Sequence, residues 1–384
     1  MRPQSLRYQC IARVILLCFL AFSQVGLAQP GQLTRTPNDT LTSPRFLPDG
    51  RVQLRIYAPK ASDVTVSGDF PGGFPSQKLV KEPTGVWSVL LGPLTPDVYT
   101  YDLNVDGVKT FDPKNSQFKE SQNGVSNLFR LPGRETDYSA IKNVPHGAVE
   151  LVWYPSKSLG ITRRMHVYTP PGYATMKEKL PVLYLLHGGG DNDASWTTVG
   201  QANFILDNLL AEGKMKPMIV VMPAGHTPKP GLAMGAGPQQ DPFAQDFLED
   251  IIPYVEKHFR VSAGQDGRAI AGLSMGGIQT LNIALWHPDL FSNVVALSTG
   301  YFPPVLSELE TKYASVLKSP QINRWKHFWI AQGGPTDIAY QNNKNMMALF
   351  DKNGIKYQYT EVPGGHSFLA WRNNLRQFVP LLFQ

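Results

Sequence analysis

The sequence predicts an α/β fold, with a mostly parallel sheet covered by helices on both faces, preceded by a small all-β sandwich of immunoglobulin-like type. In the N-terminal third, short runs of alternating apolar and polar residues are separated by turn residues, as in a β-sandwich. From about Val149, continuous apolar runs alternate with helix-like segments, which is typical of a parallel sheet buried on both faces. A chain of 384 residues is long enough for both domains.

The first 28 residues have the features of a signal peptide. Three arginines precede an apolar core at residues 14–22, and small residues follow at 26–28. The apolar core is shorter than the ~20 residues that a membrane-spanning helix needs. We therefore expect cleavage before Gln29, no membrane anchor, and a secreted or periplasmic protein.

Both cysteines, Cys10 and Cys18, lie in this segment, so the mature chain would have neither thiols nor disulfides. Loss of the segment lowers the count of Lys and Arg from 36 to 33, against 30 acidic residues. The remaining sequence has no basic stripe that would favour a nucleic-acid partner. Its composition, with 17% charged and 42% hydrophobic residues, is ordinary for a soluble globular protein.

The alternation that predicts the sandwich is clear at Val52, Leu54 and Ile56, and it returns at residues 99–105. A polar segment rich in Pro and Thr precedes this domain, and a Pro-Gly-Arg sequence follows it. The predicted boundaries are a signal peptide at 1–28, a linker at 29–44, a β-sandwich at 45–132, a second linker at 133–148 and an α/β domain at 149–384.

In the α/β domain, an amphipathic helix is expected at 243–259, because Phe247, Ile251 and Val255 recur every four residues. The predicted buried strands are the apolar runs at 182–186, 218–222, 270–273, 294–297 and 328–331, followed by a last strand at 356–362.

A G-x-S-x-G sequence, from Gly272 to Gly276, lies between a predicted strand and a predicted helix. In the α/β-hydrolase fold this sequence forms a tight turn that exposes a strained nucleophilic serine, here Ser274. Side chains at 272 and 276 would collide in such a turn, which explains the two glycines. The pattern is weak alone, but its position predicts a serine hydrolase.

A serine hydroxyl needs a base within hydrogen-bond reach. Among the eight histidines, His366 is the predicted base because it follows the last expected strand in a glycine-rich loop. Asp337 is predicted to orient the imidazole, which gives the chain order Ser, Asp, His of α/β-hydrolases. The competing acids are Asp351, in a helix-like stretch, and Glu361, on a strand.

The backbone N–H groups of Met275 and Gly189 are predicted to form an oxyanion hole. Gly189 lies in a glycine-rich turn at 187–190, after a predicted strand; the alternative is that these glycines only make a flexible turn. The residues predicted to bind substrate are Gly188, Trp196, Trp371 and Tyr301. No metal and no cofactor are predicted, because Asp191 and Asp193 lack the glycine and glutamate of a calcium-binding EF-hand loop.

These motifs together resemble carbohydrate esterase family 1, which includes feruloyl esterases, acetyl xylan esterases, mycolyltransferases and S-formylglutathione hydrolases. The resemblance rests on His-Gly-Gly-Gly at 187–190, the helix at 243–259, the segment 268–277 around the serine, and Gly365-His366 followed by Trp371. It extends from about Val149 to the C-terminus. By similarity, the triad is Ser274, Asp337 and His366, and the second oxyanion donor is Gly189.

The N-terminal domain resembles family 48 carbohydrate-binding modules over about residues 51–131. The matching segments are 58–59, 66–70, 85–87, 99–101, 105–107 and 112–113. Members that bind glycogen usually carry tryptophan at two turns, where this chain has Phe74 and Val108. We therefore expect no binding to starch, and we expect Trp87 to be a core residue. The second linker is short, so a sandwich loop at 70–76 or 112–123 is expected to wall one side of the pocket.

The resemblance implies a serine esterase that acts on ester decorations of plant cell-wall polysaccharide. The expected substrates and partners are feruloylated or acetylated xylans, and feruloyl esters of arabinoxylan are the first choice. The alternatives are an acetyl xylan esterase, a siderophore esterase similar to enterochelin hydrolases, and a carbohydrate-binding protein with an inactive hydrolase domain. The predicted signal peptide disfavours the second of these, because enterochelin hydrolases act in the cytoplasm, and the intact Ser274 and His366 disfavour the third.

Overall fold

The computed structural model describes residues 35–228 and 241–384. The predicted signal peptide, with both cysteines and the expected cleavage site before Gln29, lies outside the described residues. Within the two described ranges, none of the helices has the length and apolar character needed to cross a membrane.

The chain divides into two compact units, Met1–Leu41 and Thr42–Gln384. The described part of the first unit contains one short 3₁₀ helix, η1 (Pro37–Asp39). The N–H of Thr36 donates to the Asp39 carboxylate at 2.7 Å, which closes this turn. All further elements belong to the second unit.

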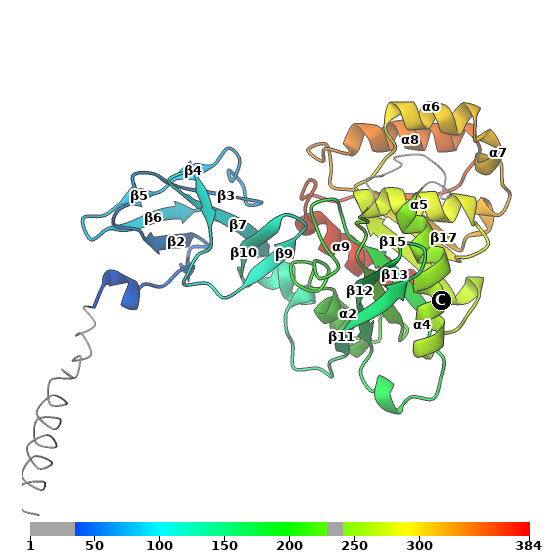
Figure 1. Ribbon diagram of the computed structural model, residues 1–384, viewed down its shortest axis with the longest axis horizontal. Coiled ribbons are helices and arrows are strands. Elements are labelled where there is room, and N and C mark those ends of the chain that lie inside the picture. The colour runs from blue at the N-terminus through cyan, green and yellow to red at the C-terminus, as the bar shows by residue number, and fades with distance from the viewer. Residues whose placement is uncertain (1–34, 229–240) are drawn as a thin grey trace, which may run out of the picture. The chain divides into compact units, whose positions relative to one another are not determined.

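The sandwich domain consists of two antiparallel sheets (Figure 1), as the alternating pattern predicts. One sheet has the order β1 (Arg45–Phe46), β2 (Val52–Tyr57), β6 (Val86–Leu91), β5 (Val80–Lys81). The other has the order β4 (Gln77–Lys78), β3 (Val64–Gly68), β7 (Val98–Val105), β10 (Gly124–Arg130), β9 (Phe118–Ser121), and β8 (Val108–Thr110) pairs with β7. Trp87 is a core residue, as expected, and its indole N–H donates to the carbonyl of Ala58 at 3.0 Å.

The α/β domain is built on an eight-stranded sheet in which six neighbouring strands are parallel. The order is β11 (Ala148–Ser156), β12 (Ile161–Thr169), β14 (Ile219–Pro223), β13 (Val182–Leu186), β15 (Arg268–Leu273), β16 (Asn293–Leu297), β17 (His327–Gln332), β18 (Gln358–Glu361). The apolar runs of the sequence coincide with the parallel strands, which confirms the predicted fold class. The antiparallel strands β11 and β12 were not predicted, because β11 is a largely exposed edge strand without a continuous apolar run.

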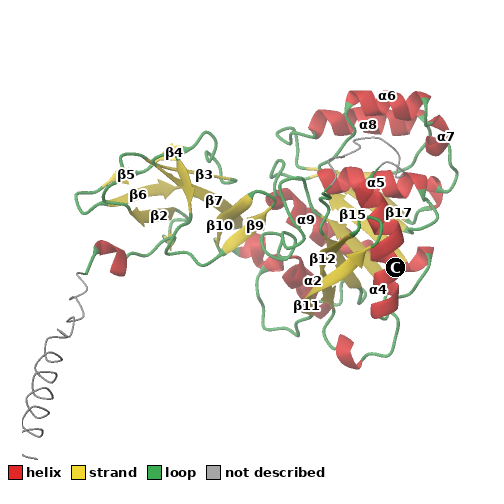
Figure 2. Ribbon diagram, in the orientation of Figure 1, coloured by secondary structure: helices red, strands yellow, loops and turns green. Residues whose placement is uncertain are grey.

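Helices cover both faces of this sheet (Figure 2). One face packs against α2 (Ala202–Ala211) and α9 (Phe368–Phe378). The other packs against α3 (Pro242–Asp246), the π-helical segment η5 (Phe247–Ile251), α4 (Ile252–His258), α5 (Met275–Trp286), α6 (Pro303–Thr311), α7 (Ala314–Leu317) and α8 (Tyr340–Lys352). Short 3₁₀ helices are η2 (Arg134–Ser139), η3 (Tyr173–Thr175), η6 (Gln265–Gly267), η7 (Ile322–Arg324) and η8 (Val379–Leu381). The helix predicted at 243–259 is therefore continuous, but a π-helical turn lies in its middle.

The segment between the two domains is bound to α2. The side-chain amide of Asn208 donates to the carbonyls of Tyr138 and Ala140, at 2.9 Å each. Asp207 accepts from the ring of His146 at 2.8 Å and from the N–H of Gly147 at 2.9 Å. These bonds hold the segment predicted as a linker against the α/β domain.

A buried arginine connects the sandwich to the α/β domain. The guanidinium of Arg372, on α9, has no exposed surface and lies 2.7 Å from the Asp97 carboxylate. It also donates to the carbonyl of Val98 at 2.9 Å and to that of Val199 at 2.6 Å. Val98 and Leu128 of the sandwich pack into the same apolar cluster as α2 and α9. The two domains therefore share a buried contact.

Candidate active site

Ser274 lies on a strained turn between β15 and α5. Its φ is +52° and its ψ is −116°, a conformation that non-glycine residues rarely adopt. A methyl group on Gly272 would lie 2.1 Å from the carbonyl oxygen of Gly276, and one on Gly276 would lie 2.5 Å from that of His187. Both positions therefore require glycine, as the predicted turn demands.

The structure brings Ser274, His366 and Asp337 into one hydrogen-bonded chain. The Nε2 of His366 lies 2.9 Å from the Oγ of Ser274, and its Nδ1 lies 2.7 Å from the Oδ1 of Asp337. The two competing acids lie elsewhere: Asp351 accepts from the hydroxyl of Tyr357, and Glu361 accepts from the hydroxyl of Tyr359.

The carboxylate of Asp337 is completely buried, but it accepts several hydrogen bonds from the protein. It accepts from the N–H of Gly333 at 3.1 Å and from that of Ala339 at 2.9 Å. Burial raises the pKa of Asp337, but the hydrogen bonds from His366, Ser298 and Ala339 outweigh burial and leave the pKa below its ordinary value. Asp337 is therefore ionised at neutral pH, so Nδ1 of the imidazole carries the proton and Nε2 faces the serine.

Trp371, which is predicted to bind substrate, lines the cavity, and its contacts also support the imidazole. Its ring meets the edge of His366 with 5.2 Å between centroids, and its Nε1 donates to the Oγ of Ser298 at 2.8 Å. Ser298 in turn hydrogen-bonds Asp337. Sequence reasoning missed Ser298, although its place directly after the buried strand β16 marks the catalytic edge of the sheet.

The glycine-rich turn at 187–190 lies directly on the nucleophile turn. A methyl group on Gly188 would lie 3.4 Å from the Cβ of Ser274, and one on Gly189 would lie 3.8 Å from the Cβ of Met275. The structure thus places the two predicted oxyanion donors, Gly189 and Met275, side by side next to the serine.

His187 sets the orientation of this turn. Its Nδ1 donates to the carbonyl of Gly188 at 2.8 Å, and its Nε2 accepts from the N–H of Gly225 at 2.8 Å. Burial lowers the pKa of His187 to about 4, so the ring is neutral at neutral pH. Because a trans peptide holds its carbonyl and N–H on opposite sides, the bond to Gly188 turns the N–H of Gly189 away from His187.

Two predicted substrate-binding residues are core residues, and those predictions are wrong. Trp196 is 1% exposed, and its Nε1 donates to the carbonyl of Leu186 at 3.1 Å. Tyr301 is also 1% exposed, and its hydroxyl donates to the side chain of Asn282 at 3.0 Å. Each ring fills space beside the sheet, because a large apolar side chain there gains more from burial than from exposure at a cavity.

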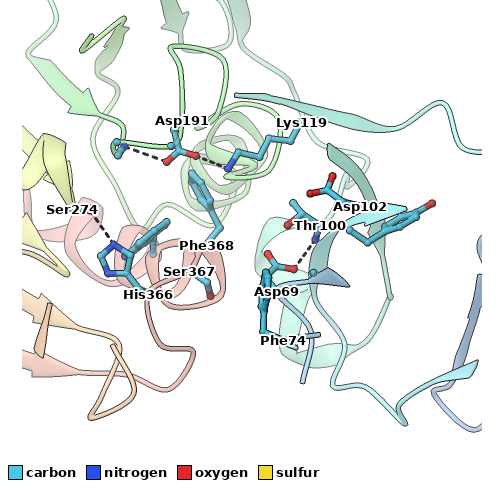
Figure 3. A pocket seen from close by; sticks show the side chains of 16 residues that line it. Asp69, Phe74, Thr100, Asp102, Lys119, Asp191, Ser274, His366, Ser367 and Phe368 are labelled. Atoms are coloured by element: carbon cyan, nitrogen blue, oxygen red, sulfur yellow. Dashed lines mark hydrogen bonds and ion pairs between the residues drawn. The ribbon is translucent and has the colours of Figure 1, made fainter. Parts of the chain in front are cut away.

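The cavity beside Ser274 holds about 310 Å³ and lies between the two domains (Figure 3). The α/β domain contributes Ser274, His366, Phe368, Trp371 and the glycine-rich turn that includes the predicted Gly188 and Gly189. The sandwich contributes Asp69, Phe74, Thr100, Asp102 and Lys119. Phe74 is 76% exposed. Phe74 and Lys119 confirm the expectation that a sandwich loop at 70–76 or 112–123 walls the pocket. Asp69, which follows β3, and Thr100 and Asp102, on β7, were missed.

In the described part of the chain, no group of three or more His, Cys, Asp or Glu side chains is arranged to hold a metal ion.

Residues 156–382, more than half of the chain, match the family model described as "Putative esterase". The chain belongs to this esterase family. Residues 42–116 match carbohydrate-binding module 48, the isoamylase N-terminal domain.

One curated relative covers both domains of the esterase. It is an endo-1,4-beta-xylanase/feruloyl esterase from Xylanibacter ruminicola, 33% identical over 349 residues, which are 88% of this chain. The esterase spans only 45% of that relative's length.

Solved structures agree on the fold. The CE1 ferulic acid esterase of the anaerobic fungus Anaeromyces mucronatus is 26% identical, with a TM-score of 0.55, and the match covers 64% of this chain and 94% of that one. This confirms the resemblance to carbohydrate esterase family 1. The enterobactin esterase of Shigella flexneri has a TM-score of 0.65 and covers 87% of this chain and 93% of its own, but at 18% identity it shares only the fold.

Proposed function

We propose that the protein is a secreted feruloyl esterase that releases ferulate from arabinoxylan of plant cell walls. The observation that carries this proposal is the hydrogen-bonded chain of Ser274, His366 and Asp337 at the cavity, next to a glycine-rich turn. The relative from Xylanibacter ruminicola, a xylanase/feruloyl esterase that covers 88% of this chain, supports the choice of substrate.

The geometry supports an acyl-enzyme mechanism. The Oγ of Ser274 attacks the ester carbonyl while its proton passes to Nε2 of His366, and the carbonyl oxygen becomes an oxyanion held by the N–H groups of Met275 and Gly189. Collapse breaks the bond to the sugar oxygen, which leaves with the proton from His366. Water then repeats these steps on the acyl-enzyme and releases the acid, while Asp337 stabilises the imidazolium.

The cavity has features that suit an aromatic acyl group and a sugar. Its volume of about 310 Å³ lies near the lower end of the range of roughly 300–1,000 Å³ for small-molecule sites. Aromatic side chains of Phe74, Phe368 and Trp371 line it, together with the polar Asp69 and Thr100. An acetyl group would leave most of this space unfilled.

The test compares methyl ferulate, feruloylated arabinoxylan and acetylated xylan with the mature protein and with Ser274→Ala. We expect the highest kcat/KM on the two feruloyl esters and no activity of the variant. Acetate release that exceeds ferulate release would instead assign an acetyl xylan esterase.

Secretion rests on the sequence of residues 1–28 alone. Expression in a bacterial host, followed by fractionation and mass spectrometry, tests it. We expect a mature chain outside the cytoplasm that begins at Gln29, and an uncleaved cytoplasmic chain would contradict secretion.

A further inference from the structure

The β9–β10 hairpin of the sandwich lies against the glycine-rich turn of the α/β domain. The N–H of Gln122, at the tip of the hairpin, donates to the carbonyl of Gly190 at 3.3 Å. The carboxylate of Glu120 accepts from the side chain of Asn192 at 3.4 Å and lies 3.4 Å from the guanidinium of Arg164. The hairpin therefore binds the segment that begins with the predicted oxyanion glycines.

Lys119 makes the shortest of these contacts between the hairpin and the α/β domain. Its ammonium group lies 2.5 Å from the Oδ1 of Asp191, as Figure 3 shows, and the two side chains are 18% and 6% exposed. The other carboxylate oxygen, Oδ2, accepts from the N–H of Gly188 at 3.2 Å, and the N–H of Asp191 donates back to the carbonyl of Gly188 at 3.1 Å. Lys119 is thus linked through one side chain to the backbone beside Ser274.

The negative charge of Asp191, close to the predicted oxyanion hole, explains the role of the Lys119 ammonium group. Negative charge develops on the substrate oxygen during acyl transfer, and a nearby buried carboxylate opposes it, since charges interact strongly in a site that excludes water. The ammonium of Lys119 offsets this carboxylate. It also lies 5.4 Å from the ring centre of Phe368, which begins the helix after His366, so Lys119 stands between the two catalytic loops.

We propose that Lys119 is a positioning residue for acyl transfer: it holds Asp191, and through it the oxyanion turn, in the reactive geometry. The sandwich domain then completes the oxyanion site in addition to lining the cavity. This inference rests on the proposed acyl-transfer function. It also differs from a carbohydrate-binding role, because it predicts a loss on esters that contain no sugar.

The test uses the full-length chain with p-nitrophenyl acetate and methyl ferulate. In Lys119→Met, which keeps an apolar stem but removes the charge, kcat is expected to fall roughly 10- to 100-fold, as for other misplaced catalytic groups. KM should change less than about threefold, because ground-state contacts persist. Lys119→Arg should restore most of the activity. Lys78→Met is the matched control, since Lys78 is on the same domain, is 81% exposed and pairs with the exposed Asp63 on the sandwich itself.

A double variant separates charge from packing. If the unpaired carboxylate causes the loss, Lys119→Met combined with Asp191→Asn should have a higher kcat than Lys119→Met alone. Thermal unfolding of each variant checks that the chains are folded. Wild-type kcat in a folded Lys119→Met, with Ser274→Ala inactive, overturns the positioning role alone, whereas an active Ser274→Ala overturns the proposed function as well.

Discussion

The two turns that meet at the cavity are stabilised in different ways. The nucleophile turn is held by its own domain: the N–H of Ser274 donates to the carbonyl of Leu297 at 2.9 Å, and Thr299 donates to the carbonyl of Ser274 at 2.9 Å. The glycine-rich turn is held from two domains. Its own His187 anchors it within the α/β domain, and Lys119 of the sandwich binds Asp191, the residue that follows the turn.

This difference shows which parts of the site are intrinsic to the sheet and which depend on the second domain. A strained serine between a strand and a helix needs only close packing and two glycines, which the end of β15 (Gly272) and the first turn of α5 (Gly276) supply. The opposing turn contains three consecutive glycines and has little conformational restraint of its own. Contacts from neighbouring side chains must fix it.

The largest expected effect lies in the nucleophile turn. Ser274→Ala and His366→Ala should each lower kcat by about a million-fold, because the members of such a triad act as a unit. Steady-state hydrolysis of methyl ferulate measures this, with circular dichroism to confirm folding. An active Ser274→Ala would mean that another group attacks the ester.

A smaller loss is expected for the residue that orients the base. Asp337→Asn keeps the size and hydrogen-bonding capacity of the side chain but favours the wrong imidazole tautomer, so kcat should fall roughly ten-thousand-fold. Full activity of Asp337→Asn would place the orienting acid elsewhere. The control is Asp351→Asn, whose carboxylate contacts Tyr357 and not His366.

The sequence predicts these elements well where local rules decide. Apolar runs locate the parallel strands. The spacing of Gly272, Ser274 and Gly276, between a strand and a helix, predicts the tight turn that carries the nucleophile. The positions of the aromatic side chains were harder to predict from the sequence. Trp196 and Trp371 both follow catalytic loops, yet only Trp371 reaches the cavity, and burial of a side chain depends on neighbours far away in the chain.

The domain contact could not be predicted at the level of residues. The ion pair between Lys119 and Asp191 joins a sandwich strand to the turn after β13, and the one between Asp97 and Arg372 spans most of the chain. Charged residues are common and their pairing across domains carries no local pattern. Only the short linker indicated that a sandwich loop would reach the pocket.

The ion pair between Asp97 and Arg372 joins the two domains at a place remote from the oxyanion turn. Removing it should lower the stability of the protein but leave catalysis unchanged. Asp97→Ala leaves the buried charge of Arg372 without its carboxylate, which is expected to cost about 3–5 kcal/mol of unfolding free energy. Urea denaturation measures this loss. Since Asp97 does not contact the glycine-rich turn, kcat of the folded variant should stay near that of the wild type.

The matched control for Asp97 is Asp49→Ala, which removes an exposed ion pair with Arg51. Such exposed pairs are screened by water and contribute little to the free energy of unfolding. Equal losses in the two variants would mean that the pair between Asp97 and Arg372 does not stabilise the domain contact.

The last prediction concerns the acid sensitivity of the glycine-rich turn. Burial lowers the pKa of His187 from its ordinary value of 6.5 to about 4. Between these values the unfolded chain takes up a proton that the folded chain does not, so stability falls as the pH decreases through this window, by about 3 kcal/mol at most. In His187→Asn this contribution is absent.

The difference in unfolding free energy between wild type and His187→Asn should therefore shrink on acidification. Urea denaturation at both ends of the pH window measures this difference. A constant difference between wild type and His187→Asn across this window would show that His187 is not held neutral by burial.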